Sequence, residues 1–235
     1  MDHDDLRARF AALTTAHMAD GCIRANLPVR CAPAAVRPMT PGSRLVGPAR
    51  PARHTGSVDV FLEVFDRGAD GGVLVVDNGG RVDEACVGDL VVLEAAAAGV
   101  VGIVIWGLHR DTADIDGIGL PVFSLGATPT GPLRLNPLPA DALVTAVVGE
   151  WRIGPDDIVV GDDDGVLFVP ADRVDEVLTL AEGIRDTERR QAELIRAGTS
   201  LREQVRFDEY LAKRREQPSL TFREHLRAIG GAIEE

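Results

Sequence analysis

The chain has 235 residues, of which 45% are hydrophobic, 26% charged and 4% aromatic, a composition that excludes wholesale disorder and predicts a folded globular protein. No apolar run reaches the ~18 residues that a membrane span needs, and the N-terminus MDHDDLRARF lacks the order of a secretory signal. We therefore expect a cytoplasmic protein without a membrane partner. The net charge of −12 lies in residues 1–181, and because this acidic body repels phosphate backbones, we expect no nucleic acid partner.

Scarce residue types exclude several kinds of chemistry. Lys213 is the only lysine and lies in a charged helical stretch, KRRE. A Schiff-base lysine must be desolvated in a pocket, and a P-loop lysine must follow glycines. Lys213 meets neither requirement, which argues against Schiff-base catalysis and against a P-loop. The cysteines Cys22, Cys31 and Cys86 have no CxxC spacing, so we expect reduced, buried thiols. The histidines have no HxxxH or similar spacing, which argues against a zinc site.

The first half of the chain predicts strands and helices in alternation. In chain order the predicted elements are an amphipathic helix over residues 5–20, a strand over 43–47, a short helix or strand over 57–66, a buried strand over 72–77, an alanine-rich helix from Asp89 to Gly99, and buried strands over 102–106 and 120–124. Strand, helix and strand joined by short links indicate a parallel β-α-β unit in one sheet.

The second half is rich in predicted strands and ends in helices. Strands are expected over 143–148, 158–160 and 166–169, with a solvated turn over 161–165. A long amphipathic helix then runs from about Asp172 to Ala197 and ends at Gly198. The tetrapeptide Thr221-Phe-Arg-Glu224 has the pattern of a capping box and predicts a final short helix.

Two loops of the predicted sheet carry residues that could do chemistry. Cys86-Val-Gly-Asp89 opens a helix, whose amide groups and dipole favour an anion. Gly107-Leu-His-Arg-Asp111 follows the strand that ends at Trp106. Twenty residues separate Asp89 from Arg110, enough for one helix and the return strand, so both loops should reach the same edge of the sheet.

The residue types in these loops suit the binding of a small keto acid. Arg110 presents a planar fork that can hold a carboxylate or a carbonyl, and Asp111 and Asp89 offer hard oxygen ligands for Mg²⁺. A metal ion, a guanidinium and a helix N-terminus together would bind a small 2-oxo acid and stabilise its enolate. The alternative is that Asp89 is only a helix cap and Arg110–Asp111 a solvated loop.

A longer stretch of the sequence resembles a known family. The run VGDLVVLEAAAAGVVGIVIWGLHRD (87–111) is similar to the RraA-like family, which is named for the regulator of ribonuclease activity RraA and includes 4-hydroxy-4-methyl-2-oxoglutarate aldolases. The aldolase signature is an Asp, twenty residues and then Arg-Asp, and Asp89, Arg110 and Asp111 match it. Two further segments look like family blocks, LVVDNGG (74–80) and DDDGVLFVP (162–170).

The resemblance implies a fold and an assembly. The fold would be α/β, a layered α-β-β-α sandwich with a C-terminal helical extension, and the chains would form homotrimers or homohexamers with sites between subunits. We accordingly expect a catalytic domain over residues 1–198 that ends in the long helix, and a helical tail over 199–235. We expect this amphipathic tail to lie at a subunit interface; the alternative is a tail folded back on its own domain.

The resemblance also implies roles for individual residues. Asp111 would ligate Mg²⁺ (or Mn²⁺) directly and Asp89 through a water molecule, while Arg110 would hold the keto acid and neutralise the enolate oxygen. Backbone amides would receive the substrate carboxylate, and they belong to Gly88, Asp89, Leu90 and Val91. Glu188, contributed by the C-terminal helix of a neighbouring subunit, is the candidate for a further acidic ligand.

These observations predict a divalent-metal-dependent lyase, with Arg110 and Asp89 as catalytic residues. It would cleave a small 2-oxo acid through enolpyruvate, by a retro-aldol reaction of the 4-hydroxy-4-methyl-2-oxoglutarate type, by decarboxylation of oxaloacetate, or by both. The alternative is a non-catalytic RraA-type regulator that binds ribonuclease E through its oligomer surface. His109 stands where many relatives have an apolar or small residue; it is either a local acid or base or a group that fills space beside Trp106.

Overall fold

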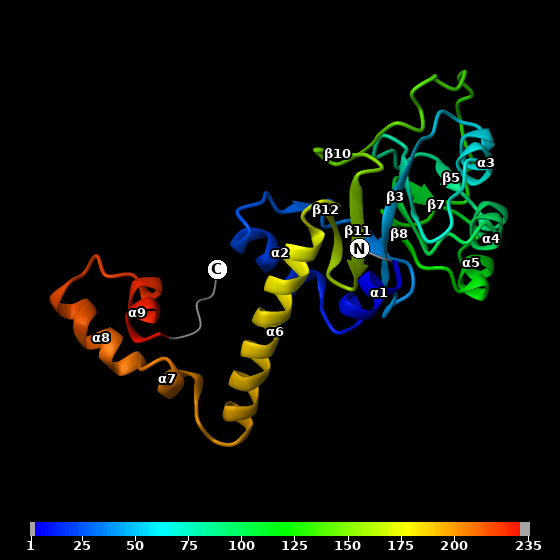
Figure 1. The fold of residues 1–235 in the computed structure, drawn as a ribbon. Helices are drawn as coiled ribbons and strands as arrows, with labels where there is room; N and C mark the ends of the chain where they lie inside the picture. The colour runs from blue at the N-terminus through cyan, green and yellow to red at the C-terminus, as the bar shows by residue number, and fades with distance from the viewer. Residues whose placement is uncertain (1–2, 231–235) are drawn as a thin grey trace.

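One mixed sheet forms the centre of the structure (Figure 1), a computed structural model that describes residues 3–230. Its strands are β1 (Arg30–Cys31), β2 (Arg37–Pro38), β3 (Leu45–Arg53), β4 (Val73–Asp77), β6 (Gly102–Trp106), β8 (Val122–Ser124), β11 (Asp157–Asp162) and β12 (Gly165–Pro170). Their order is β1-β12-β11-β3-β4-β6-β8-β2. The pairs β3–β4, β4–β6 and β6–β8 are parallel, so the predicted β-α-β unit is confirmed.

Two short strand pairs lie beside this sheet. β9 (Ala146–Val148) and β10 (Trp151–Ile153) form an antiparallel hairpin. β5 (Ala85–Val87) and β7 (Leu108–His109) pair in parallel. The sequence patterns predicted β9 as part of 143–148, but they did not predict β5, β7 or β10.

Helices cover both sides of the sheet (Figure 1). They are α1 (His3–Ala11), α2 (Thr15–Arg24), α3 (Asp59–Asp66), α4 (Asp89–Ala97), α5 (Thr112–Ile118), α6 (Val174–Arg196), α7 (Leu201–Gln204), α8 (Phe207–Glu216) and α9 (Phe222–Ile229). α1, α2 and α6 lie on one side of the body, and α3, α4 and α5 on the other.

The sheet is curled, because consecutive strands lie at its opposite edges. β1 and β2 are the two outermost strands, yet only residues 32–36 separate them, and a connection of that length spans at most ~20 Å. Arg37 Nη1 joins the edges by donating to the carbonyl oxygens of Asp163 (3.1 Å) and Asp164 (2.9 Å) in the β11–β12 turn. The curl turns one sheet into two layers that face each other.

Three buried clusters fill the spaces between the layers. One lies between the α1, α2 and α6 side and the sheet, one inside the curl, and one between the sheet and the α3, α4 and α5 side. Their large members include Met18, Leu167 and Leu178 in the first, Phe123 and Phe168 in the second, and Phe61, Leu74 and Ile105 in the third. The order helix, sheet, sheet, helix confirms the α-β-β-α sandwich.

The predicted single helix over residues 5–20 is wrong. The chain forms α1 and α2 instead, and Thr14 is the N-cap of the second helix. Its hydroxyl accepts from the His17 backbone N–H (3.2 Å), and its own N–H donates to His17 Nδ1 (3.0 Å). This reciprocal capping starts a new helix where the apolar spacing alone suggested continuity.

Two burial predictions also need correction. The three thiols are free as expected, but Cys31 is exposed, whereas Cys22 and Cys86 are buried. Asp162, expected in a solvated turn, is buried at the end of β11. Its carboxylate accepts from the Thr15 backbone N–H (2.8 Å) and from the Thr15 hydroxyl (2.6 Å), so it ties α2 to the sheet.

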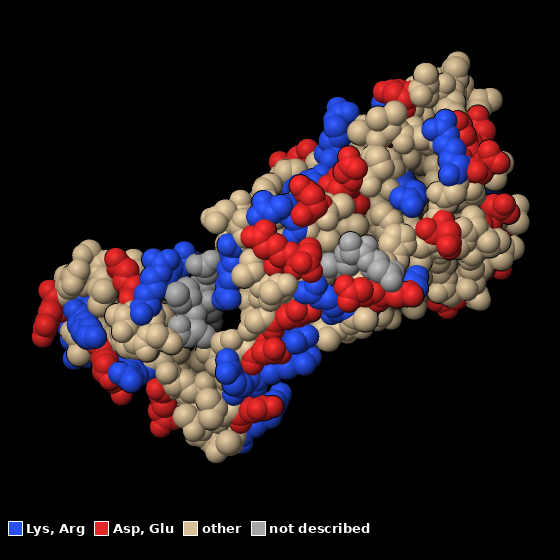
Figure 2. All heavy atoms as spheres, viewed as in Figure 1, with Lys and Arg blue, Asp and Glu red and all other residues tan. Residues whose placement is uncertain are grey.

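The predicted helical extension is present and stands away from the body. α6 is buried against the body as far as Ile184, and α7, α8 and α9 form a separate group at its end (Figure 1). Four rings hold this group together with centroid distances between 5.0 and 6.0 Å: Phe207, Tyr210, Phe222 and His225. On the face in Figure 2, acidic and basic side chains are interspersed over this extension. No helix within residues 3–230 is long and apolar enough to cross a bilayer.

Replacing Asp162 tests the link between α2 and the sheet. Asp162→Ala should lower the free energy of unfolding by about 2 kcal/mol, because two donors of Thr15 lose a buried, charged acceptor. The exposed neighbour Asp164 provides the control, since Asp164→Ala should change this value by less than ~0.5 kcal/mol. Urea denaturation at pH 7 measures both. Equal losses in the two variants would contradict the assignment.

Candidate functional site

The two predicted loops meet because their strands pair. β5 and β7 run parallel, with Ala85 opposite Leu108 and Val87 opposite His109. β5 leads into α4 and β7 into α5, so both loops leave the same edge. The Arg110 backbone N–H donates to the Val87 carbonyl (3.0 Å) and extends this pairing. The convergence expected from the twenty-residue spacing is therefore present.

Gly88 is the point at which the two loops touch. A Cβ atom there would lie 2.6 Å from Asp111 Oδ2 and 3.2 Å from Arg110 Nε. The backbone of Gly88 is extended (φ −127°, ψ −175°), a conformation that any residue adopts. Glycine therefore matters at this position because it has no side chain, and this absence lets a guanidinium and a carboxylate lie against the start of α4.

The backbone conformation of Asp111 keeps its carboxylate out of helix capping. It is the N-cap of α5 in the left-handed region (φ 60°, ψ 40°), and its side chain caps no helical N–H. An N-cap aspartate ordinarily accepts from the first turn, whereas this carboxylate turns to Arg110, with Nε 3.3 Å from Oδ2. The side chains of Arg110 and Asp111 are 46% and 36% exposed. A non-glycine residue here costs on the order of 1 kcal/mol, and such strain clusters at functional sites.

A pocket of ≈ 370 Å³ opens beside these two side chains. Its lining residues are Arg110, Asp111, Thr112, Ala127, Thr128 and Pro129. The wall over 127–129 is tied to β7, because the His109 N–H donates to the Gly126 carbonyl and the Thr128 N–H to the His109 carbonyl, each at 3.0 Å. The pocket thus combines one guanidinium and one carboxylate with hydroxyl and methyl groups.

His109 is buried beneath the pocket and does not line it. Its Nδ1 lies 2.8 Å from the Ser124 hydroxyl, and its Nε2 lies 3.2 Å from the Thr112 hydroxyl. Burial lowers the pKa of His109, so the ring is neutral at pH 7. This geometry favours a structural role over that of an acid or base, although the ring does more than fill space, because it joins Ser124 of β8 to Thr112 at the start of α5.

The helix cap is Gly88, not Asp89. Asp89 is the first residue of α4 and is half-buried, and no side chain caps this helix N-terminus. The amide groups of Asp89, Leu90 and Val91 therefore lie in the first turn without a side-chain acceptor. An uncapped helix N-terminus beside a guanidinium suits a carboxylate.

Glu188 does not reach this pocket within one chain. It lies on α6, on the other side of the body from α4 and α5 (Figure 1), and its carboxylate pairs with His17 Nε2 at 3.0 Å. Within residues 3–230, no three His, Cys, Asp or Glu side chains converge on a point that could enclose a metal ion. Of the two predicted carboxylate ligands, Asp111 lines the pocket and Asp89 is not among its lining residues, and Mg²⁺ accepts one or two protein carboxylates while keeping several waters.

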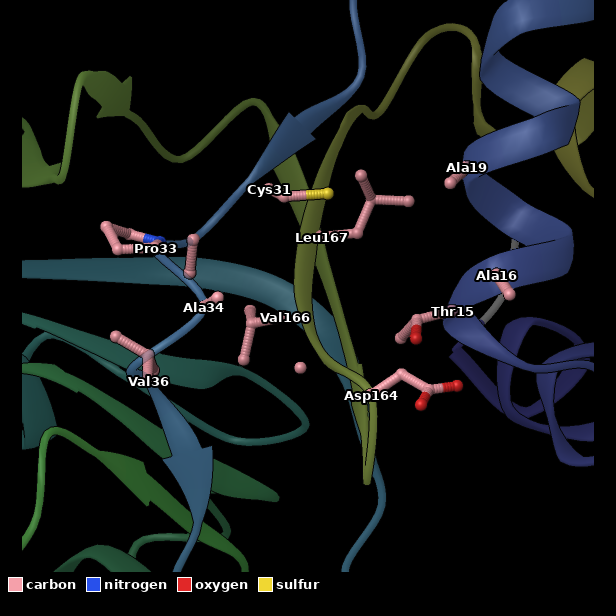
Figure 3. A pocket seen from close by; sticks show the side chains of 12 residues that line it. Thr15, Ala16, Ala19, Cys31, Pro33, Ala34, Val36, Asp164, Val166 and Leu167 are labelled. Carbon is pink, nitrogen blue, oxygen red and sulfur yellow. The ribbon is translucent and has the colours of Figure 1, made fainter.

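A second pocket, of ≈ 260 Å³, lies between α2, β1 and β12 (Figure 3). Small apolar side chains such as Ala16 and Val166 dominate its lining, and Cys31 contributes its sulfur. Cys31 is exposed as a residue, but partial burial of its thiol raises the pKa of this group above the ordinary value, which disfavours a thiolate at neutral pH. This pocket lacks the pairing of cation and carboxylate found beside Gly88, so we assign the candidate site to the first pocket.

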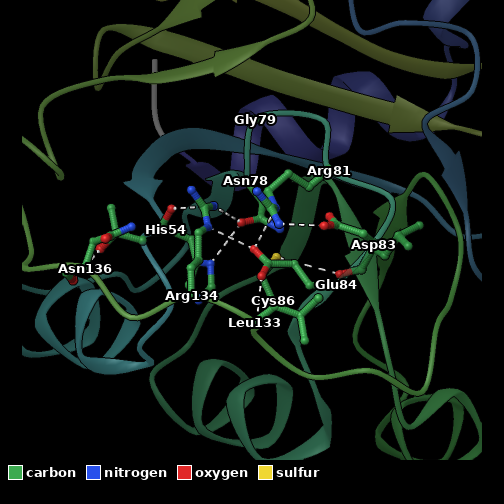
Figure 4. Close-up of polar contacts among 12 residues, drawn as sticks. His54, Asn78, Gly79, Arg81, Asp83, Glu84, Cys86, Leu133, Arg134 and Asn136 are labelled. Atoms are coloured by element: carbon green, nitrogen blue, oxygen red, sulfur yellow. Dashed lines mark hydrogen bonds and ion pairs between the residues drawn. The ribbon is translucent and has the colours of Figure 1, made fainter.

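A buried polar network adjoins the strand that leads to Gly88 (Figure 4). Glu84 precedes β5 with a side chain 0% exposed. Its oxygens accept from the Leu133 backbone N–H (2.7 Å) and from Arg134 Nε (3.0 Å), and Arg81 Nε lies 3.1 Å away. Burial by itself would raise the pKa of Glu84, but the Leu133 N–H and the Arg134 guanidinium outweigh it and hold the pKa below its ordinary value.

His54 and Asn78 continue this network. Arg134 Nη2 donates to Asn78 Oδ1 (2.6 Å), and His54 Nδ1 lies 3.0 Å from the same oxygen. The His54 ring stacks on Phe61 with centroids 5.5 Å apart. His54 Nε2 and Asn78 Nδ2 are buried without a protein partner. Burial, together with the charge of Arg134, lowers the pKa of His54.

None of the network residues was predicted from the sequence. Glu84 and Arg134 are fifty positions apart, and Arg134 belongs to a segment without regular structure. Charged residues in such segments ordinarily indicate a solvated surface. The run Arg81-Val-Asp-Glu84 carried no signal that separates its last, buried carboxylate from its exposed neighbour Asp83.

Comparisons with known proteins identify relatives. A family model described as RraA-like, Aldolase/RraA, matches residues 15–168. Protein DlpA of Legionella pneumophila is 32% identical over 180 residues, which are 74% of this chain and only 29% of DlpA. A Halalkalibacterium halodurans protein with the provisional name 4-hydroxy-4-methyl-2-oxoglutarate aldolase is 30% identical over 153 residues, 63% of this chain and 70% of that protein.

A solved structure shows the same fold. RraAS2 of Streptomyces coelicolor, described as an unusual member of the RNase ES inhibitor RraA protein family, matches with a TM-score of 0.69 and 26% identity. The match covers 79% of this chain and 95% of that chain. Together these matches confirm the resemblance inferred from residues 87–111 and the layered fold.

The buried histidine of the network predicts a pH dependence of stability. The pKa of His54 is lower in the folded state than in the unfolded state, where it is about 6.5. The unfolded chain therefore binds the proton more readily, and stability should fall as the pH drops below about 6.5. In His54→Gln, the free energy of unfolding should depend less on pH between about 5 and 7.

Urea denaturation at several pH values measures this slope. His3→Gln serves as the control, because His3 is exposed. The same pH slope in His54→Gln and in the wild type would show that His54 is not the group responsible.

Proposed function

Because the chain belongs to the RraA-like family, whose Aldolase/RraA model spans residues 15–168, we propose that the pocket beside Gly88 makes it a divalent-metal-dependent carbon–carbon lyase for a small 2-oxo acid. The observation that carries the proposal is the packing of Arg110 and Asp111 over the bare backbone of Gly88. The family also contains proteins described as ribonuclease inhibitors, so family membership alone does not establish an enzyme.

The residues of this chain fit the binding of a 2-oxo acid. The substrate carboxylate would take the first amide groups of α4, over Gly88–Val91, where no side chain competes for them. The keto oxygen would face Arg110, whose planar guanidinium can also donate two hydrogen bonds to a carboxylate. Asp111 would hold Mg²⁺ or Mn²⁺ directly and Asp89 would hold it through water, which suits ions that keep several waters. When bound, the metal ion would polarise the keto oxygen.

Arg110 would act on the charge that develops during the reaction. When the bond between C3 and C4 of the substrate breaks, its electron pair moves into the C2–C3 fragment and negative charge gathers on the former keto oxygen. The guanidinium stabilises this developing charge more strongly than it stabilises the neutral ketone of the bound substrate. The difference lowers the activation barrier of bond cleavage. The remaining fragment leaves as carbon dioxide or, when the C4 hydroxyl has given its proton to water, as a carbonyl compound. A proton taken up from water at C3 then gives pyruvate. Aldol cleavage and oxaloacetate decarboxylation share this enolpyruvate intermediate.

We further propose that the active form is a homotrimer or homohexamer with its sites at subunit boundaries. Leu90 and Leu93 are exposed on α4, the helix whose N-cap is Gly88. A surface helix with apolar residues on its outer face is typical of an interaction site. A neighbouring copy could then supply Glu188 to this pocket, and the projecting α7–α9 extension could pack against another subunit.

A non-catalytic regulator that binds a ribonuclease E-type enzyme is the second candidate function. The match to RraAS2 of Streptomyces coelicolor favours it. Release of pyruvate from oxaloacetate, measured with Mg²⁺ and with EDTA, separates the two functions. Only background decarboxylation, the same with and without the chelator, would remove the lyase proposal.

Two substitutions test the roles of the site residues. Arg110→Ala should lower kcat/KM by ~10²–10³-fold, because the stabilising charge at the enolate oxygen is lost. Arg110→Lys should rescue little, since an ammonium group lacks the planar fork. Asp111→Ala should lower the rate and abolish its response to added Mg²⁺. Arg67→Ala, at the exposed C-cap of α3, is the control. Unchanged kinetics in the site variants would exclude these residues from the mechanism.

The assembly is tested separately by light scattering. The wild type should have the mass of a trimer or hexamer, and Leu93→Asp should reduce it, because a charge would be buried in the interface. Leu135→Asp is the matched control, since Leu135 is an exposed leucine on a loop. A monomeric wild type would contradict sites shared between subunits.

A further inference from the structure

One segment of chain forms a wall of the pocket and contacts Arg110. Residues 127–129 line the pocket, and a Cβ atom on Gly131 would lie 2.8 Å from Arg110 Nη1. Gly88 approaches the same side chain at Nε. The guanidinium therefore lies between the bare backbones of two glycines, and the position of residues 127–134 limits where it can go.

Hydrophobic packing does not hold this wall in place. Its large apolar side chains point to solvent, since Leu133 is 63% exposed and the adjacent Leu135 is 79% exposed. The segment has no helix or strand of its own. Other interactions must therefore set its position.

The carboxylate of Glu84 supplies the main anchor. It accepts from the backbone of Leu133 (2.7 Å) and from the side chain of Arg134 (3.0 Å). The next residue, Ala85, donates its N–H to the Thr130 carbonyl at 2.8 Å. These bonds attach the wall to the start of β5, the strand that ends immediately before Gly88.

Arg134 extends the anchor to two further loops (Figure 4). Its Nη2 donates to Asn78 Oδ1 (2.6 Å) and to the His54 carbonyl (3.2 Å). The guanidinium thus joins residues that follow β3 and β4 to the wall. The Glu84 carboxylate is fully buried and the Arg134 side chain is 30% exposed, so the pair is screened less than two surface charges would be.

We propose that Glu84 and Arg134 are positioning residues for Arg110, and that their ion pair holds residues 127–134 against its guanidinium. The inference rests on the proposed lyase function, in which Arg110 faces the enolate oxygen. Stabilisation of developing charge depends on a preorganised donor, and a misplacement of ~1 Å can cost about 100-fold in rate. A loosened wall would therefore lower kcat while the metal ligands stay in place.

Three variants separate positioning from stability: Glu84→Gln, Arg134→Met and the double variant. Glu84→Gln removes the carboxylate partner of Arg134, and Arg134→Met leaves the buried Glu84 with only Arg81 and the Leu133 N–H, so the melting temperature should fall in both variants. The double variant contains neither charge, so its melting temperature should recover. Its kcat should nevertheless stay about 100-fold below the wild type, because the wall loses its side-chain anchor and keeps only backbone bonds such as those of Thr128 and Thr130. Recovery of kcat together with melting temperature would show that the pair serves stability only.

Gly131→Ala moves the guanidinium while the ion pair stays intact. The added methyl group would press on Arg110 Nη1, so kcat should fall without a loss of melting temperature. Gly117→Ala in α5 is the matched control, because a Cβ atom there meets nothing within 4 Å, and its kcat should equal that of the wild type. Wild-type kcat in Gly131→Ala would contradict the role of the wall.

Two measurements test the proposal without using enzyme activity. In all three ion-pair variants, the amides of residues 127–136 should exchange hydrogen faster than in the wild type. Phenylglyoxal should modify Arg110 faster as well, with the exposed Arg67 as an internal reference whose rate stays constant.

The outcomes distinguish the two proposals. Suppose that the wild type is inactive, but that the variants show faster hydrogen exchange and faster modification of Arg110. The lyase proposal would then fail, whereas the ion pair would still be what positions Arg110. Unchanged exchange or unchanged Arg110 modification would overturn the positioning role, whatever the activity.

Discussion

Close approach of two backbones at Gly88 is the constraint on which the site depends. Parallel pairing of β5 and β7 sets the two loops one strand spacing apart, ~4.8 Å. At that spacing, a side chain at position 88 would occupy the space of Asp111 Oδ2 and Arg110 Nε. The left-handed backbone of Asp111 then turns its carboxylate away from capping and toward this point. The strain of that turn is tolerated because the strand pairing determines where both loops begin.

The strands and the loop spacing of this arrangement could be predicted from the sequence where apolar residues form a regular pattern. β4 and β6 are continuous apolar runs bounded by glycine, the pattern of strands buried on both faces. The spacing from Asp89 to Arg110 then placed two loops at one edge. β5 and β7 have only three and two residues, which is too short for any periodicity. The break before α2 was also missed, because Thr14 acts through a local hydrogen bond rather than through apolar spacing.

The buried network shows why side-chain burial was harder to predict than the strands. Glu84 would be costly to bury alone, and its contacts with Arg134, Arg81 and the Leu133 N–H offset that cost. The contact joins positions fifty residues apart, so neither residue carries local evidence of its burial. A charged residue in an irregular segment is ordinarily solvated, and only the folded chain identifies the exception.

The exposure of the site connects its chemistry to assembly. Arg110 and Asp111 are 46% and 36% exposed in one chain, and water at that level weakens the attraction between a guanidinium and a developing anion. Electrostatic catalysis of the proposed kind needs a drier pocket. Leu90 and Leu93 are exposed on α4, the helix that begins beside Gly88, so a neighbouring copy that covers the start of this helix would also exclude water from Arg110. In that arrangement, a single contact between subunits would do two things. It would bury the apolar face of α4, and it would enclose Arg110 so that its attraction to the developing anion becomes stronger. A lyase built on this chain would therefore gain its electrostatic strength on assembly, while the ion pair of Glu84 and Arg134 sets the position of Arg110 within each subunit.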